Sequence, residues 1–381
     1  MPATRGTAPA RGTSSRPSGG RAARTAPPPI LVRQIRNGFV EAVHRGDVVE
    51  VDASGRMLHV IGDPDRVVNL RSAVKPFGVL ALLGAHGVDS LDLTSEELAL
   101  MASSHSGEDL HVRTLQAMYR RLQLSTSVLQ PGVSPPLDAL TAARLARDGE
   151  RPGVVRHMCS GQHTVFILLC RLGDWPMDGY WEAEHPAQRA YSAAVAAMFG
   201  VRPEKLVTGI DGCGILTYAF RLREVAEAYA VLADPDALPS ADPRATFASH
   251  LRSIRDAMRA HPELVAGSRD RLDTSLMKAV DGRVVSKSGM EGLRGVGILS
   301  GARGDGSAAT GVAVKIEDGD ASDRAAYSAG VEALRQVGVL DGQALRTLAR
   351  YHRVPSLDPH GRLAAEAVPE FDLAPVGELT R

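Results

Sequence analysis

The chain has 381 residues, 44% of them hydrophobic, so it can bury a large core, and its length predicts about two domains or one large α/β domain. Its 44 basic and 44 acidic residues give a formal net charge of +0, which argues against the strongly basic surface of a nucleic-acid-binding protein. Three cysteines are too few for a disulfide scaffold, and neither a membrane-spanning run nor a secretory signal is recognisable, so we expect a cytoplasmic protein with no membrane partner.

The first 29 residues are rich in Arg, Ala, Thr, Ser, Gly and Pro and show no apolar periodicity. Such a composition buries too little apolar surface to offset the entropy of ordering, so residues 1–29 are predicted to form a disordered tail. Its arginines would suit an acidic partner, but a solvated tail is the simpler interpretation.

Strand patterns occur near both ends of the chain. Residues 38–51 and 57–62 read as two strands, and the turn-forming residues 52–55 between them predict a hairpin. Three later runs rich in β-branched residues, 282–287, 295–299 and 311–317, are also typical of strands. If the early hairpin pairs with the late strands, one antiparallel sheet forms from distant pieces of the chain.

The middle of the chain is predicted to be mostly helical. A helix is expected from Ser72 to Leu83, and a capping box at Thr94–Glu97 begins another that runs to about Ser103. Further helices are expected within 107–260, at 323–337 and at 343–351.

The predicted fold class is therefore α/β (α+β), an antiparallel sheet beside a helical lobe, similar to serine β-lactamases and penicillin-binding proteins. One domain at 30–352 would take its sheet from 30–65 and 282–318 and its helical lobe from about 90–275. Residues 353–381 would form a C-terminal tail.

A serine and a lysine stand three residues apart in the segment Arg71–Phe77. On a helix Ser72 and Lys75 would share one face, and Pro76 requires the helix to begin close to Ser72 because proline clashes with the carbonyl four residues earlier. A lysine of lowered pKa can remove the proton that makes a serine hydroxyl nucleophilic. This motif alone is weak, since a solvated lysine on a helix gives the same pattern.

Two other segments carry similar chemistry. Residues 103–108 (SSHSGE) follow the capped helix, where they are either a polar helix end or part of a site. Residues 286–292 (SKSGMEG) end a strand, and Lys287-Ser288-Gly289 resembles the K-T-G segment that lines the cleft of β-lactamase-type enzymes. The simpler interpretation is a lysine at an exposed strand end.

The cysteines allow a metal site. Cys159 is placed at a helix start with His163 four residues later, and Cys213 follows a probable strand. Two thiolates and a further donor can hold zinc, but two buried cysteines that pack as small apolar residues fit equally well. Cys170 lies in an apolar run and is expected in the core.

These motifs in this order (RSAVKPF, SHSGE, CSGQH, GIDGCG and SKSGMEG) resemble the rhizobial-type L-asparaginases over residues 31 to about 340. The resemblance implies hydrolysis of L-asparagine to L-aspartate and ammonia, a serine β-lactamase-like fold and a homodimer. It also implies two serine–lysine tandems, Ser72 with Lys75 and Ser104 with Lys287. Ser72 would be acylated, Lys75 would be its base, and the second tandem would transfer protons or position the substrate.

The resemblance further implies a zinc site and a substrate pocket. The family's zinc ligands are two cysteines and a lysine; Cys159 and Cys213 match the cysteines, but Gln162 stands at the position of the lysine. Three outcomes are open: His163 replaces the lysine, zinc binds weakly, or the site holds none. The residues expected to bind or support the substrate are Arg71, His163, Asp211 and Gly212.

Two other functions remain open besides asparagine hydrolysis. Gln162 leaves room for a serine–lysine amidase that acts on another small amide. A non-catalytic ligand-binding relative is the third hypothesis, against which the two intact serine–lysine pairs argue. A β-lactamase or transpeptidase is disfavoured because no S-D-N element and no secretory signal are found.

Overall fold

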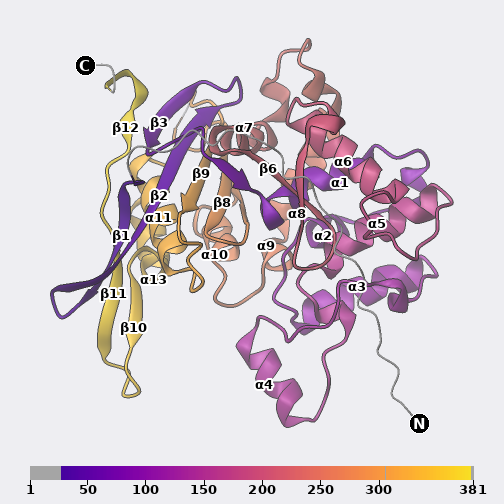
Figure 1. The fold of residues 1–381 in the computed structure, drawn as a ribbon, viewed down its shortest axis with the longest axis horizontal. Helices are drawn as coiled ribbons and strands as arrows, with labels where there is room; N and C mark the ends of the chain where they lie inside the picture. The colour runs from indigo at the N-terminus through magenta and orange to yellow at the C-terminus, as the bar shows by residue number, and fades with distance from the viewer. Residues whose placement is uncertain (1–26, 305, 379–381) are drawn as a thin grey trace, which may run out of the picture.

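The computed structural model describes residues 27–304 and 306–378, and Figure 1 shows their arrangement. A broad antiparallel sheet forms one side of the molecule, and a group of helices forms the other. Most of the predicted N-terminal tail, residues 1–26, lies outside the described residues.

The main sheet is assembled from both ends of the chain. Its strands run in the order β10-β11-β1-β2-β9-β8-β7, β3 also pairs with β2 and β12, and every pairing is antiparallel. The early strand β2 lies beside the late strand β9 with Val49 opposite Ala313, which confirms the predicted antiparallel sheet. The strands are β1 (Ile30–Arg36), β2 (Phe39–Asp52), β3 (Met57–Ile61), β7 (Val284–Ser288), β8 (Leu293–Ile298), β9 (Thr310–Ile316), β10 (Val354–Leu357), β11 (Leu363–Pro369) and β12 (Ala374–Pro375).

Helices cover both faces of this sheet. Helix α7 packs on β8, β9 and β2, while α11 contacts β9, β1 and β11. The remaining helices form the second lobe or flank the sheet edge, and the predicted helices are found within a few residues of their expected bounds. The helices are α1 (Lys75–Leu83), α2 (Ser95–Met101), α3 (Asp109–Arg121), α4 (Ala139–Arg147), α5 (Ser160–Leu172), α6 (Pro186–Met198), α7 (Leu222–Ala233), α8 (Ala248–Ala260), α9 (Pro262–Val265), α10 (Leu272–Ala279), α11 (Arg324–Gln336), α12 (Gly342–Thr347) and α13 (Ala349–His352).

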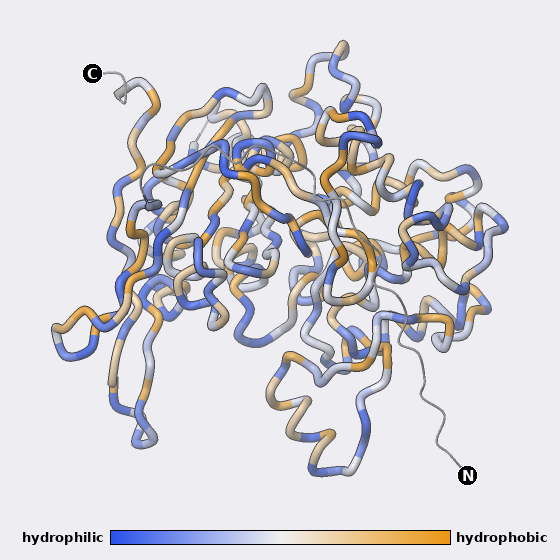
Figure 2. Tube along the Cα trace, in the orientation of Figure 1, coloured by the Kyte–Doolittle hydropathy of each residue, from blue (hydrophilic) through white to orange (hydrophobic). Residues whose placement is uncertain are grey.

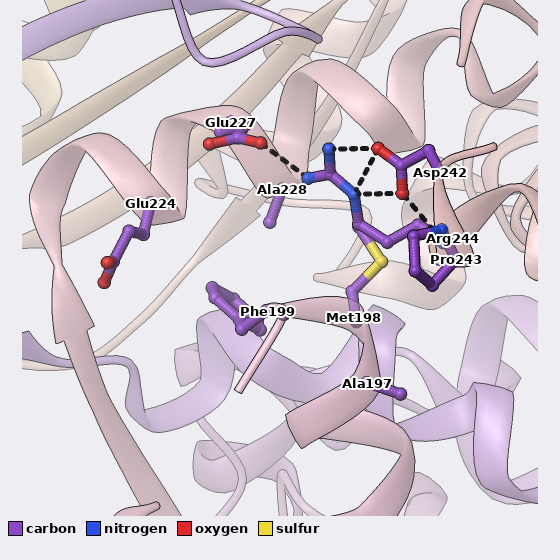
Figure 3. A pocket seen from close by; sticks show the side chains of 10 residues that line it. Ala197, Met198, Phe199, Glu224, Glu227, Ala228, Asp242, Pro243 and Arg244 are labelled. Atoms are coloured by element: carbon purple, nitrogen blue, oxygen red, sulfur yellow. Dashed lines mark hydrogen bonds and ion pairs between the residues drawn. The ribbon is translucent and has the colours of Figure 1, made fainter. Parts of the chain in front are cut away.

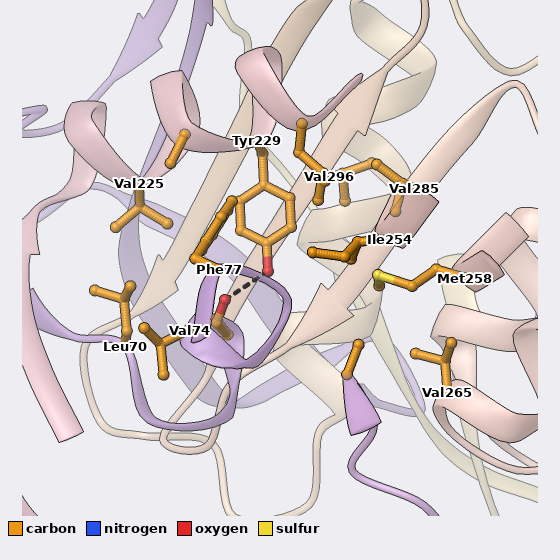
Figure 4. Packing of buried hydrophobic residues seen from close by; sticks show 14 of the residues in the cluster. Leu70, Val74, Phe77, Val225, Tyr229, Ile254, Met258, Val265, Val285 and Val296 are labelled. Atoms are coloured by element: carbon orange, nitrogen blue, oxygen red, sulfur yellow. Dashed lines mark hydrogen bonds between the residues drawn. The ribbon is translucent and has the colours of Figure 1, made fainter. Parts of the chain in front are cut away.

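Helix α7 lies close to the sheet because β8 and β9 carry glycines where it crosses them. A Cβ at Gly295 would come within 2.2 Å of the Tyr229 ring, and one at Gly311 within 1.8 Å of the Ala226 carbonyl. Any other residue would push the helix away from the sheet. The close approach brings Tyr229 next to the turn that leads into α1, as Figure 4 shows.

Three further strands form a small second sheet. Its strands β4 (Val67–Asn69), β6 (Leu216–Arg221) and β5 (Val207–Ile210) are antiparallel in that order. β4 leads directly into the start of α1, and the turn between β5 and β6 carries Asp211, Gly212 and Cys213. The small sheet therefore brings two predicted site segments close together.

The C-terminal segment differs from its prediction. Residues 353–381 were expected to form a tail, but β10, β11 and β12 belong to the main sheet, and β11 pairs with β1. Alternation of Leu363, Ala365 and Ala367 is the signal in the sequence, but alanines give it little hydrophobic contrast. Pairing with β1 supplies the backbone hydrogen bonds that the local sequence does not predict.

Hydropathy varies from residue to residue along most of the trace. Figure 2 shows apolar and polar residues interspersed in most elements. Among the described helices, none is long and apolar enough to cross a membrane.

Candidate active site

Three segments that are distant in the sequence meet around one serine hydroxyl. Ser104 follows α2, Lys75 is the first residue of α1, and Lys287 lies in β7. Lys75 Nζ donates to Ser104 Oγ at 2.9 Å, and Lys287 Nζ donates to the same oxygen at 3.0 Å. Each of the three residues is at most 5% exposed, so the hydroxyl is shared by two lysines in a site that largely excludes bulk water.

Lys75 has a full set of acceptors. Besides Ser104 Oγ, its Nζ donates to the Ser103 carbonyl at 2.8 Å and to Cys159 Sγ at 3.3 Å. A lysine ammonium has three N–H donors, so each of them finds a partner. These contacts hold Lys75 in one position between α2 and the start of α5.

Ser72 lies one turn before Lys75, in the short 3₁₀ helix η1 (Arg71–Val74) that leads into α1. Pro76 occupies the first turn of α1, as its sequence position predicted. In the described part of the chain, Ser72 Oγ makes no hydrogen bond, and it is not one of the fully inaccessible oxygens. Because η1 also contacts β7, Ser72 presents an unengaged hydroxyl near the lysine-bearing strand.

The turn that carries Ser72 is held from both sides. Tyr229 Oη donates to the Ala73 carbonyl at 2.8 Å (Figure 4). On the other side, Arg71 has a φ of 46°, in the left-handed region, and its N–H donates to Thr217 Oγ1 at 3.0 Å. Such strain costs energy and is retained where the surroundings fix it, often at sites of function.

Charge and burial favour the neutral amine form of Lys287. Burial lowers the pKa of Lys287 well below its usual range, and the positive charge of Lys75 lowers it further, against the attraction of Asp273. A neutral lysine amine can accept a proton from a hydroxyl group. The sequence assigns Lys75 as the base for Ser72, whereas the structure directs Lys75 Nζ to Ser104; the role of each lysine stays a prediction.

The backbone around Ser104 is fixed independently of its side chain. Ser104 N–H donates to the Val265 carbonyl at 3.0 Å, and His105 N–H donates to the Met158 carbonyl at 3.1 Å. Arg271 Nη2 donates to the Ser104 carbonyl at 3.1 Å. Sequence reasoning missed Arg271, because its position before α10 gives no motif that relates it to Ser104.

The predicted metal ligands come together only in part. Cys159 and Cys213 lie within hydrogen-bonding contact; this contact and then Lys75 lower the pKa of the Cys159 thiol against the effect of burial. Gln162 Nε2 donates to Tyr191 Oη at 3.0 Å, while its Oε1 is buried without a partner. Within the described residues, no group of three or more histidine, cysteine, aspartate or glutamate side chains is placed to hold a metal ion.

This donor set does not fit a family-type zinc site. Zinc favours thiolate, imidazole and carboxylate ligands, and a neutral amide is a poor replacement for the third. His163 Nδ1 lies 2.6 Å from Tyr180 Oη, burial lowers the pKa of its imidazole to about 3, and its Nε2 has no hydrogen-bond partner among the described residues, so its replacement of the lysine stays a prediction. Cys170 is buried in α5, as expected for a core residue.

The remaining predicted residues form an ion pair at the edge of the site. Arg71 Nε donates to Asp211 Oδ1 at 2.6 Å, and the Gly212 N–H donates to the same oxygen at 2.7 Å. The Arg71 side chain is 24% exposed, so a ligand can reach it. His163 has no exposed surface.

A separate cavity of about 380 Å³ lies between the end of α6, α7 and the 3₁₀ helix η7 (Pro243–Phe247), as Figure 3 shows. Arg244 fills part of it and pairs with both Asp242 and Glu227. None of the lysines or serines described above lines it.

Comparison with known proteins agrees with these motifs. A family model described as L-asparaginase II matches residues 32–368. The chain belongs to the L-asparaginase II family. This asparaginase-family protein is accordingly an amidohydrolase, a hydrolase that cleaves amide C–N bonds of a small molecule. No curated protein matches the chain.

Several solved structures show a distant likeness to this L-asparaginase II family member. A crystal structure of a protein named Mglu in its native form is 18% identical, with 79% of this chain and 67% of that chain covered and a TM-score of 0.35. A probable glutaminase from Bacillus subtilis is 14% identical, with 74% and 83% covered and a TM-score of 0.33. The complex of that glutaminase with 6-diazo-5-oxo-L-norleucine is also 14% identical, with 74% of this chain and 78% of that chain covered and a TM-score of 0.32.

Proposed function

We propose that the protein hydrolyses L-asparagine to L-aspartate and ammonia by serine–lysine nucleophilic catalysis. The observation that carries this proposal is the hydroxyl of Ser104, hydrogen-bonded by both Lys75 and Lys287; the short helix that carries Ser72 contacts the strand of Lys287. An amide carbonyl is attacked by a serine only when a base removes the hydroxyl proton, and a buried lysine can be that base.

The reaction would proceed through an acyl-enzyme. Ser72 Oγ attacks the side-chain amide carbon, and its proton passes through Ser104 Oγ to the neutral Lys287. Backbone N–H groups at the start of η1 would stabilise the oxyanion. The C–N bond then breaks, ammonia leaves with the returned proton, and water hydrolyses the ester to release aspartate and restore Ser72.

The ion pair at the edge of the site would bind the ends of the amino acid. A free amino acid carries an α-carboxylate and an α-ammonium, and Arg71 and Asp211 offer the complementary charges on adjacent side chains. We therefore propose Arg71, Asp211 and Gly212 as substrate-binding residues, with His163 as their support.

A second substrate is favoured by one specific observation. Gln162 stands where the resembling family has a lysine, and its Oε1 is a buried acceptor without a partner. A changed group one helical turn after Cys159 would alter the volume and polarity near the two thiols. Glutamine or another small amide is therefore the alternative substrate, and the ratio of kcat/KM for the two amides separates them. A non-catalytic ligand-binding relative would instead be stabilised by asparagine without releasing ammonia.

The resemblance also supports a cytoplasmic homodimer. The three cysteines are free, which suits a reducing compartment. Light scattering coupled to size-exclusion chromatography measures the mass in solution, and a monomer at micromolar concentration would contradict the dimer.

Ammonia release from L-asparagine tests the proposed function. We expect wild type to release ammonia and Ser72→Ala to lose roughly three orders of magnitude or more in kcat. Chelator-treated and zinc-supplemented enzyme should give similar rates, because the third donor is a neutral amide. A folded wild type that releases no ammonia with or without zinc would contradict asparagine as the substrate.

A further inference from the structure

Asp273, in the first turn of α10, is a buried carboxylate that the proposed mechanism does not use. Its side chain is 2% exposed and forms an ion pair with Arg294, whose side chain is also 2% exposed. Burial would raise the pKa of Asp273, but Arg294, Lys287 and the serine hydrogen bonds together lower it, so the group is a carboxylate. Keeping a charge in the interior is costly unless several donors compensate it.

The donors come mainly from the two residues that flank Lys287. Ser286 Oγ donates to Asp273 Oδ1 at 2.7 Å. Ser288 donates to Asp273 Oδ2 twice, from its N–H at 2.9 Å and from its Oγ at 2.7 Å. Arg294, opposite Ser288 on β8, completes the set at 2.5 Å.

This arrangement determines where Lys287 points. Successive side chains of a strand lie on opposite faces, so holding Ser286 and Ser288 on one face places Lys287 on the other. There its Nζ reaches Ser104 Oγ at 3.0 Å. Among the described strands, β7 is the last of the sheet and pairs only with β8, so Asp273 accepts the Ser288 N–H that no described strand pairs with.

We propose that Asp273 is a positioning residue for Lys287: by holding Ser286 and Ser288 it fixes the lysine amine at the Ser104 hydroxyl. The inference deepens the proposed amide hydrolysis and rests on it for its kinetic readout. Its second role is electrostatic, because the carboxylate is the acidic group that faces Lys287 from α10. The other charged or titratable groups around Lys287 are Lys75, Arg271 and Cys159.

The substitution Asp273→Asn tests the proposal, since it keeps the shape and removes the charge. We expect kcat to fall by about 10- to 100-fold with KM nearly unchanged, as for a misplaced proton-transfer group. The acidic limb of the kcat profile should move to lower pH by about one unit or more, because losing a nearby anion disfavours the protonated lysine.

A readout that needs no substrate separates this proposal from the proposed function. The chain contains five lysines, so 13C-lysine NMR resolves each titration, and the missing signal in Lys287→Met assigns the one of interest. Asp273→Asn should shift the Lys287 midpoint downward. If that shift occurs while wild type releases no ammonia, the positioning role stands and asparagine hydrolysis falls.

Glu332→Gln provides the matched control. Glu332 in α11 is also a mostly buried carboxylate, with Arg335, His352 and Gln336 as partners. This variant should lower the melting temperature but leave kcat and the Lys287 titration unchanged. If Asp273→Asn does not fold, Asp273→Asn with Arg294→Met removes both charges and is read in the same way. A folded variant with wild-type kcat and an unshifted Lys287 would overturn the proposal.

Discussion

At the scale of single residues, the central feature is a hydroxyl that two lysines share. Ser104 Oγ lies about equally far from Lys75 and Lys287, and like charges so close disfavour the protonation of both. The arrangement therefore favours the neutral amine of Lys287 in a buried site. This is the condition for moving a proton away from Ser72 without a histidine.

The lowered pKa of Lys287 has a consequence for stability. The unfolded chain binds a proton at this lysine up to its ordinary pKa of 10.5, while the folded chain releases it at lower pH. In that window the unfolded state holds more protons, so the free energy of unfolding rises with pH by up to about 1.4 kcal/mol per unit from this group. Urea unfolding of Lys287→Met at pH 7, 8 and 9 should lack that slope.

Lys278→Met is the control for this prediction. Its side chain is 58% exposed and remains solvated in both states, so the pH slope should equal that of wild type. Equal slopes for wild type and Lys287→Met would show that Lys287 titrates alike in the folded and unfolded chains. Lys287→Met should also be inactive, because it lacks the amine that accepts the proton.

Residue types and spacing predicted much of the site. The S-x-x-K spacing and Pro76 located the helix start, and the three serine- or lysine-bearing segments do meet. Sequence could not show that Lys75 Nζ turns to Ser104 and Cys159, since that contact depends on how α1, α2 and α5 pack. The role of Asp273 could not be predicted for the same reason, because its contacts with Ser286 and Ser288 depend on the packing of α10 against β7.

At the scale of elements, α2 links a strong local signal to the site. Thr94 Oγ1 accepts from the Glu97 N–H at 3.3 Å, and Glu97 Oε2 accepts from the Thr94 N–H at 3.0 Å, as the capping box predicted. The helix ends just before Ser103. Its position thus sets where the Ser104 loop begins.

Removing this cap should cost stability and little activity. We expect Thr94→Ala to lower the free energy of unfolding by about 1 kcal/mol, measured by urea denaturation. Turnover at 25 °C should stay close to wild type, because Val265 and Met158 hold the Ser104 loop independently. Thr94→Ser keeps the hydroxyl and should be nearly as stable as wild type. A loss as large in Thr94→Ser would assign the effect to the methyl group instead.

Elements with strong local patterns were predictable, and those that depend on pairing were not. The β2–β3 hairpin, α2 and α11 carry clear periodicity, turn residues or caps. β6, β10 and β11 were missed because their alternation is weak and their stability comes from neighbouring strands. Arg71 in its left-handed conformation likewise follows from Asn69 and Thr217, which accept its N–H.

At the scale of the whole molecule, the site forms only when segments that are distant in the sequence pack together. Lys287 and the sheet come from late segments, Ser72 and Ser104 from early ones, and the β5–β6 turn adds Asp211 and Cys213 from the middle. Because no single lobe contains the full set, catalysis and the complete fold should be lost together on unfolding. The glycines of β8 and β9 serve the same assembly, because they let α7 approach the sheet closely enough for Tyr229 to reach the turn that carries Ser72.

The most direct test is to identify the acylated residue during turnover. Wild-type enzyme would be mixed with L-asparagine, quenched in acid within milliseconds and digested for peptide mass spectrometry, with Ser72→Ala and Ser104→Ala treated alike. The account predicts an aspartyl ester on the peptide that contains Ser72, absent from Ser72→Ala and slower to form in Ser104→Ala. An ester on Ser104, or on neither serine while ammonia is released, would contradict the proposed mechanism.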